Sequence, residues 1–343
     1  MRFCCNGGGA REQDRIQILK QKETKAGKAA ARKARRLVNM MKIAERLVVA
    51  DLTTGLSTFK RRISSKEVEA LVDAGKIDEA LDTIPWDKLP EDLSKLRDRS
   101  ENAVLNSSKF AVETLPGVSP TFIIGTANPS VQRFLDNQTG LLITGIQEDS
   151  RRAVTNAIAQ SLDNAVRPKQ VGKLIKQSIG ITEKQSQKIM FMQAKEFAER
   201  DELRTQLQQL KLQGKTTTAS AQRIRAKLLT LTDTRIEQRA IRRSAVAQTN
   251  RVNTIARTEM TKAVNQGQLE VWGAAADEGL IERDNSFKVW VSVPDDRRTQ
   301  ICADLDGTKI PLDEQFFVNQ TGENVDSPPA HPNCRSALTL VSE

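Results

Sequence analysis

The residues best suited to hold a metal ion lie near the end of the chain. Cys302 and Cys334 offer sulfur ligands, and His331, the only histidine in the 343 residues, offers an imidazole. His331 and Cys334 are separated by two residues on a proline-flanked turn, a spacing that suits zinc. Three interpretations stay open. We favour a small core with neutral His331 and free thiols; the others are a zinc site and a Cys302–Cys334 disulfide, which a reducing cytoplasm disfavours.

The presence of only one histidine also limits which kinds of catalytic site the chain can form. With one histidine, the chain has no Ser-His-Asp triad away from His331 and no metallohydrolase site built on two histidines. The sequence also shows no Gly-rich phosphate loop followed by Lys-Ser/Thr, and no paired carboxylates in a recognisable site. We therefore predict that the protein is not an enzyme.

Several charged residues accompany these ligands, and they have two interpretations. The favoured one is a buried, hydrogen-bonded ion network that pins a helix to a small sheet, because a small module needs such staples. The alternative is a binding site. The charged residues are Arg257, Glu259, Asp295, Arg297 and Arg335.

The elements that would position these residues form a small α+β module. Residues 287–293 alternate in the manner of a strand, and residues 307–310 and 337–340 read as two further short strands beside a helix over 247–276. We expect Trp290 to anchor the core of this module with Trp272 of the helix facing it. A stacking platform for nucleic-acid bases is the less favoured alternative, since few aromatic residues lie nearby.

The rest of the chain is predicted to be mainly α, with long helices and a helical hairpin. Tyrosine is absent, aromatic residues make up 4%, and good helix formers dominate. The pattern predicts a long helix over 11–50, short helices within 62–108, helices over 131–146 and 153–166, and a hairpin of helices 183–213 and 219–231. We divide the chain into a basic arm (1–50), a small helical segment (51–118), a helical body with the hairpin (119–245) and the C-terminal α+β module (246–343).

Positive charge is concentrated at the N-terminus. The net charge is +10, and residues 1–46 hold 13 Lys or Arg against 4 Asp or Glu. Such an arm suits phosphate backbones or an acidic protein surface, although a solvated tail has the same composition. A second basic stretch, residues 223–257, is more often a solvated helix face than a contact surface. The candidate DNA or partner contacts are Arg32, Lys33, Arg35, Arg36, Arg239, Arg242 and Arg243.

Nothing in the sequence predicts a membrane protein. No apolar run reaches the roughly 18 residues needed to span a bilayer. Cys4 and Cys5 lie beside basic residues, but Gly does not follow Met1, and we do not expect lipidation. We expect synthesis in a cytoplasm and no membrane contact.

Four short motifs occur in a fixed order near the C-terminus. They are Ile255-Ala256-Arg257-Thr258-Glu259 with Ala263, Asn265 and Gly267; Val289-Trp290-Val291 leading into Pro294-Asp295-Asp296-Arg297; Cys302-Ala303-Asp304-Leu305-Asp306-Gly307; and Pro328-Pro329-Ala330-His331-Pro332-Asn333-Cys334-Arg335. Together these motifs resemble the phage Mu F-like minor head protein family. The resemblance is specific over about residues 245–341 and extends with less specificity to about residue 130.

The resemblance implies a structural minor capsid protein of a tailed bacteriophage. Members of the family are typically low-copy head proteins that associate with the portal vertex and assist head morphogenesis or genome handling. The implied partners are the portal protein, the major capsid or scaffold protein, and the double-stranded DNA genome, with multiple copies located in the virion near the portal vertex. The alternative is a basic DNA-binding protein acting on the packaged or ejected genome.

The sequence departs from the family pattern at one position of the cysteine pair. Where relatives show the first cysteine, this chain has Thr299, and threonine is not a usual zinc ligand. The site would then hold zinc with three protein ligands and water, or with an acidic residue such as Asp304, or would hold no metal. No cofactor is otherwise implied.

Overall fold

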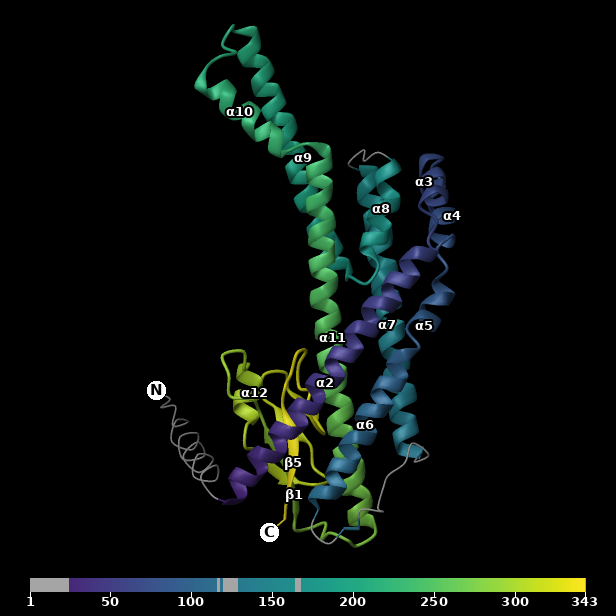
Figure 1. The fold of residues 1–343 in the computed structure, drawn as a ribbon, viewed down its shortest axis with the longest axis vertical. Helices are drawn as coiled ribbons and strands as arrows, with labels where there is room; N and C mark the ends of the chain where they lie inside the picture. Colours follow the sequence, from purple (N-terminus) through teal and green to yellow (C-terminus); the bar gives the residue numbers. More distant parts are fainter. Residues whose placement is uncertain (1–24, 116–117, 120–128, 164–167, 343) are drawn as a thin grey trace, which may run out of the picture. The chain divides into compact units, whose positions relative to one another are not determined.

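The computed structural model describes residues 25–115, 118–119, 129–163 and 168–342. The protein is 71% helical with a small C-terminal module that contains the strands, which confirms the predicted fold class (Figure 1). Cys4, Cys5 and the first part of the predicted basic arm lie outside the described residues. Among the described residues, no helix is both long enough and apolar enough to cross a membrane.

The chain divides into two compact units, and each is assembled from separate stretches of sequence. The first unit contains residues 1–50, 95–139 and 253–343, and the second contains 51–94 and 140–252. The four contiguous domains that we expected from the sequence stay a prediction. The candidate residues near the C-terminus all belong to the first unit.

Three long helices contribute residues to both units. They are α2 (Lys25–Arg62), α7 (Pro129–Asp163) and α11 (Asp233–Asp277). The α7 helix replaces the two helices predicted over 131–146 and 153–166. The polar residues between those ranges include no Gly or Pro, so the helix continues through them. In the same way, α2 continues past the predicted end at residue 50.

Helix ends carry residue types that favour capping positions. The Ser64 hydroxyl accepts a hydrogen bond from Glu67 N at the start of α3 (Ser65–Asp73). Thr182 forms a capping box with Gln185 at the start of α9 (Glu183–Leu212). Gly180, just after α8 (Pro168–Ser178), has φ +80, the left-handed conformation that ends helices.

The predicted helical hairpin is present in the second unit. The α9 helix packs against α10 (Ala219–Thr230), which Thr218 caps. Leu203, Leu231 and Ile236 form a buried cluster at this seam. Three short helices lie between α3 and α6 (Lys95–Thr114), which has 20 residues. The short helices are α4 (Ile77–Asp82), η1 (Trp86–Lys88) and α5 (Leu89–Asp92).

The C-terminal module contains two small antiparallel sheets. One has the order β2-β1-β5, from Lys309–Pro311, Ser286–Val291 and Ala337–Ser342; in it Lys288 lies opposite Ile310 and Leu340. The other pairs β3 (Phe316–Val318) with β4 (Glu323–Val325). A short helix, α12 (Gln300–Leu305), joins β1 to β2. The strand pattern of the sequence predicts the first sheet but neither the second sheet nor α12, because these elements are too short to show a clear period.

Candidate functional site

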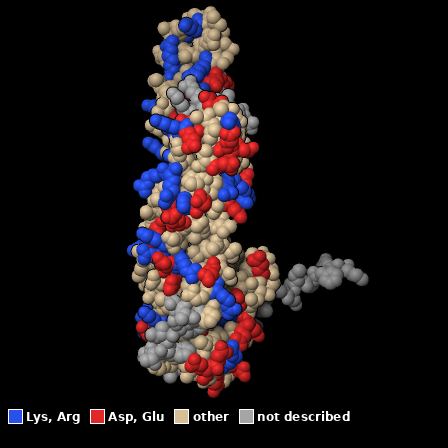
Figure 2. Space-filling model, turned by 90° about the vertical axis from the view of Figure 1, so that its right-hand side faces the viewer, with Lys and Arg blue, Asp and Glu red and all other residues tan. Residues whose placement is uncertain are grey.

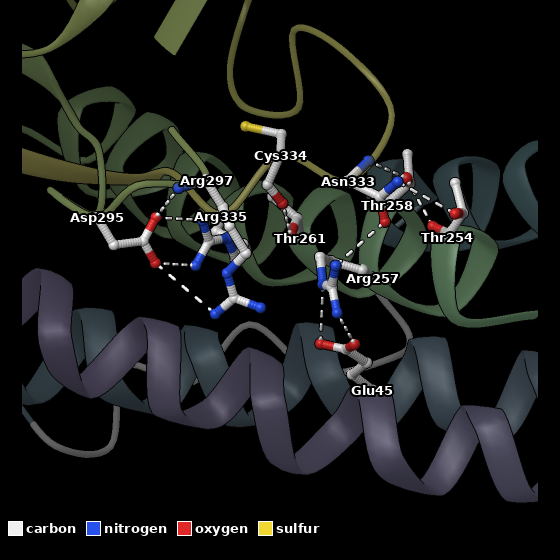
Figure 3. Close-up of polar contacts among 10 residues, drawn as sticks. All are labelled: Glu45, Thr254, Arg257, Thr258, Thr261, Asp295, Arg297, Asn333, Cys334 and Arg335. Atoms are coloured by element: carbon white, nitrogen blue, oxygen red, sulfur yellow. Dashed lines mark hydrogen bonds and ion pairs between the residues drawn. The ribbon is translucent and has the colours of Figure 1, made fainter. Parts of the chain in front are cut away.

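One face of α11 binds the Pro-flanked loop that carries His331 and Cys334. The Thr261 hydroxyl donates to the Cys334 carbonyl at 3.0 Å, and Asn333 N donates to Thr258 Oγ1 at 3.1 Å (Figure 3). Asn333 Nδ2 also donates to Thr254 Oγ1 at 3.1 Å. Residues 254, 258 and 261 are spaced by four and three, so they share one face of the helix. This face fixes the loop along its length.

Asn265 extends the same face and fixes the last strand. The side chain is fully buried. Its Oδ1 accepts from Leu338 N at 2.8 Å, while Nδ2 donates to the carbonyls of Thr261, Pro328 and Ser336 at 2.8, 3.4 and 3.3 Å. One amide therefore ties α11 to β5 and to both ends of the loop. Asn265 belongs to the first of the four sequence motifs, but its local sequence pattern predicts no such role.

The charged residue on this face, Arg257, pairs with a helix far away in sequence. Its guanidinium donates to both carboxylate oxygens of Glu45 on α2, at 2.7 and 3.3 Å, and to Asn333 Oδ1 at 3.2 Å (Figure 3). A two-pronged Arg–carboxylate contact fixes orientation as well as distance. Arg257 thus connects α2, α11 and the loop.

A second pair lies inside the module. Arg335 donates to both oxygens of Asp295, with Nη2 to Oδ1 at 2.6 Å. The hydrogen bonds from the Arg335 guanidinium, with a backbone hydrogen bond from Arg297 N, lower the pKa of Asp295 to about 2. The Arg297 side chain is 77% exposed and lies 3.8 Å from Asp295. The pair joins the turn after β1 to the residue after Cys334.

Glu259 takes part in neither pair. Its carboxylate accepts from Gln138 Nε2 on α7, and Gln138 Oε1 accepts from Lys262 Nζ. Burial raises the pKa of Glu259, opposed by the Gln138 hydrogen bond and the Lys262 charge. The five charged residues therefore make three separate contacts and not the single network expected from the sequence.

The Arg335–Asp295 pair leads to a prediction in acid. The folded-state pKa of Asp295, about 2, lies below its ordinary value of 3.8, so the ionised pair stabilises the fold above about pH 4. That contribution is lost as the pH falls toward 2. We expect Asp295→Asn to be less stable than the wild type at pH 6, with the gap shrinking between pH 4 and 2. Urea unfolding of both proteins across this range measures the gap, and a gap that does not change with pH contradicts the assignment.

The three predicted ligands come together as a cluster. The Sγ atoms of Cys302 and Cys334 are 3.6 Å apart, and His331 Nε2 lies 2.9 Å from Cys302 Sγ. Both thiols are buried, and no disulfide joins them. The Asp304 carboxylate instead accepts from Gln300 and Gln320 and is not part of this cluster. Asp304 is therefore not the fourth ligand that we considered.

Hydrogen bonding fixes the protonation of the cluster. The Pro332 carbonyl, which can only accept, lies 2.7 Å from His331 Nδ1, so this nitrogen carries the proton and Nε2 has a free lone pair. A hydrogen bond from the Cys302 thiol lowers the pKa of Cys334 to about 6. The same shared proton, with burial, raises the pKa of Cys302. Loss of a proton from this pair is therefore favoured at Cys334 over Cys302.

The donor set fits a zinc ion held by three protein ligands. Zn–S bonds of about 2.3 Å place two tetrahedral sulfurs roughly 3.8 Å apart, close to the observed 3.6 Å. Nitrogen and sulfur ligands of a tetrahedral zinc ion lie roughly 3.5 Å apart, so the His331 ring would move away from Cys302 Sγ, which now lies 2.9 Å from Nε2. A bonded Nδ1–H is the usual partner arrangement for a zinc-bound histidine. Thr299, the departure from the family pattern, points its hydroxyl at His331 Nε2 at 2.8 Å.

Thr299 offers a direct test of this geometry. Thr299→Cys should turn three ligands into four, so that zinc affinity rises at least about tenfold. Thr299→Ser keeps a hydroxyl in the same place and should leave the affinity unchanged. Competition with a chromophoric chelator measures both variants and the wild type. Equal affinities for the Cys variant and the wild type would show that the side chain at position 299 does not reach the metal, and no measurable zinc binding by either protein would show that the cluster does not accept a metal.

The predicted core tryptophans are buried, but their partners differ from the expectation. Trp290 is fully buried and meets Phe316 of β3 edge-on, with ring centroids 5.2 Å apart. Trp272 is buried beside a different cavity, which Leu37, Phe110 and Leu340 also line. Trp290 anchors the two small sheets to each other.

The predicted DNA or partner contacts separate into two groups. Lys33 donates to the Thr114 carbonyl, Arg36 stacks on Phe110, and both Arg239 and Arg243 bind Glu196. These four side chains are engaged within the protein. The other three are exposed: Arg32, Arg35 and Arg242. Basic and acidic side chains are interspersed on the face drawn in Figure 2.

Comparison with known proteins gives one family. The model of the family described as Phage Mu protein F like protein matches residues 201–339, which include the end of α9, α10, α11 and most of the C-terminal module. No curated protein and no solved structure matches this chain. Residues 201–339 are therefore a domain of the phage Mu protein F-like family, a family of head morphogenesis proteins.

Proposed function

We propose that this protein is a structural minor head protein of a tailed bacteriophage that associates with the portal vertex and assists head morphogenesis and genome packaging or ejection. The observation that carries the proposal is the family match over residues 201–339. Its partners would be the portal protein, the major capsid or scaffold protein, and the double-stranded DNA genome. Multiple copies would lie in the virion near the portal vertex.

The chemistry of the cluster supports a structural role over a catalytic one. Cys302 and His331 are close enough to form a nucleophile–base pair, with 2.9 Å between Sγ and Nε2. The cavity beside them, however, has a volume of about 10 Å³, room for about one water molecule. A substrate has no access to the buried sulfurs in this arrangement, whereas a single ion fits.

Co-expression with the portal protein of the same phage tests the proposal. We expect a tagged portal protein to retain the full-length chain through size-exclusion chromatography, while the tagged major capsid protein as bait retains less. Stronger retention by the tagged major capsid protein than by the tagged portal protein would indicate binding to the capsid shell. Recovery only as a free protein, with neither bait, would overturn the proposed role.

A further inference from the structure

An exposed stripe of positive charge runs along α2. Its members follow the spacing of one helical face, at i, i+4, i+7, i+14 and i+18, and all five side chains are exposed. None of them makes an ion pair or side-chain hydrogen bond with another described residue. The stripe spans 18 residues, or about 27 Å of helix. Its members are Lys28, Arg32, Arg35, Lys42 and Arg46.

The other basic residues of α2 point elsewhere. Lys33 and Arg36 contact α6, as described above, so they are not part of the stripe. Glu45, the one acidic residue between positions 25 and 50, is occupied by Arg257. The charge of the stripe is therefore not neutralised along its own helix.

The stripe ends at a cationic cavity in the first unit. Lys42, Arg46 and the uncharged Thr261 are among the residues that line a cavity of about 210 Å³, and the charged side chains that line it from α11 and the C-terminal module are again basic. These are Arg257, Arg297 and Arg335. Two acidic residues, Glu45 and Asp295, hold Arg257 and Arg335 in place (Figure 3). The cations therefore outnumber the acids, and the fixed guanidinium groups resist reorientation.

We infer that the α2 stripe and this cavity form one binding surface for the phosphate backbone of a nucleic acid. Cations spaced by one or two turns along about 27 Å match a linear polyanion, whereas a cluster of protein carboxylates would contact only part of this surface. Arginine forks suit phosphate oxygens. The lining of the cavity contains no aromatic ring on which a base would stack, so contact with the backbone alone is expected to be independent of base sequence.

This inference deepens the genome contact in the proposed function and assigns it to a defined surface. It also removes Lys33, Arg36, Arg239 and Arg243 from the DNA contacts expected from the sequence. None of these four residues lies on the stripe or lines the cavity, and each contacts another residue of the protein.

A charge-matched pair of variants of the full-length protein tests the surface. The stripe variant carries Arg32→Gln, Arg35→Gln, Lys42→Gln and Arg46→Gln. The control variant carries Lys184→Gln, Lys188→Gln, Lys211→Gln and Lys215→Gln, four exposed lysines of α9 and the turn after it. Both lose the same net charge, and glutamine is a good helix former. The probe is a fluorescein-labelled random-sequence DNA duplex, followed by anisotropy between 50 and 300 mM NaCl.

We expect the stripe variant to bind the duplex at least about tenfold more weakly at 100 mM NaCl. The slope of log K against log salt should be shallower by about 3 to 4, because each phosphate contact contributes about 0.9. The control variant should behave as the wild type. Equal losses in both variants, or no loss in the stripe variant, would overturn the inference.

Two further arms separate other outcomes. Binding of poly-glutamate as tight as binding of the duplex at equal salt would show a general carboxylate surface and contradict a phosphate site. Incorporation of the stripe variant into heads tests the proposed function by itself. A variant that enters heads but no longer binds DNA supports both statements, whereas a wild-type protein that binds DNA through the stripe but never enters heads contradicts only the proposed function.

Discussion

Replacing Asn265 by leucine should destabilise the first unit by about 3 to 5 kcal/mol. Leucine fills a similar volume but leaves Leu338 N and the carbonyls of Pro328 and Ser336 without their partner. Each buried polar group left unsatisfied costs about 1–3 kcal/mol. Because the amide joins α11 to β5, the loss should also loosen the loop that carries His331 and Cys334.

The matched control is Asn39→Leu on the exposed side of α2. This change should alter stability by no more than about 0.5 kcal/mol. Urea denaturation followed by tryptophan fluorescence reports on the module through Trp272 and Trp290. If Asn265→Leu unfolds at the same urea concentration as Asn39→Leu, the amide is not a staple.

Gly267→Ala should be the second large effect, at about 3 kcal/mol. Gly267 lies where α11 meets α6: its carbonyl accepts from Ser108 Oγ at 3.1 Å, and the neighbouring Gln268 donates to the Ser107 carbonyl at 2.6 Å. A Cβ at Gly267 would overlap Ser107 Oγ and the Val104 carbonyl oxygen. The hydroxyl can rotate away, but the backbone oxygen moves only if α6 shifts. Overpacking of this kind costs about 1–3 kcal/mol or more.

Gly273→Ala on the same helix is the control, because a Cβ there meets nothing within 4 Å. It should stabilise the protein by about 0.5–1 kcal/mol through the higher helix propensity of alanine. Thermal unfolding of the two variants should therefore shift in opposite directions. A shift of the same sign in both would show that α6 and α11 are not in close contact at Gly267.

Local chemistry was predictable from the sequence. Ser64 and Thr182 are of residue types that favour the N-cap position, and they cap α3 and α9, while Gly180 adopts the left-handed conformation that glycine favours after a helix. The order of the C-terminal motifs predicted the family before any structural information. These features depend on residues a few positions apart, so a single sequence contains the necessary information.

The partners of the charged residues were not predictable in the same way. Arg257 pairs with Glu45, which lies 212 positions earlier, and Glu259 pairs with Gln138, 121 positions earlier. Nothing in the local pattern identifies such partners. One available signal was missed, however: Thr254, Thr258 and Thr261 place polar groups on one face of a long helix, and Asn265 extends that face.

The position of the protein in assembled heads tests the central claim most directly. Quantitative mass spectrometry of purified heads, with the portal protein as the internal standard, would give its copy number, and cryo-electron microscopy of the portal vertex would give its location. The proposed function predicts a low-copy protein that stays with heads through gradient purification and adds density at the portal vertex. Purified heads that lack the protein altogether would contradict it.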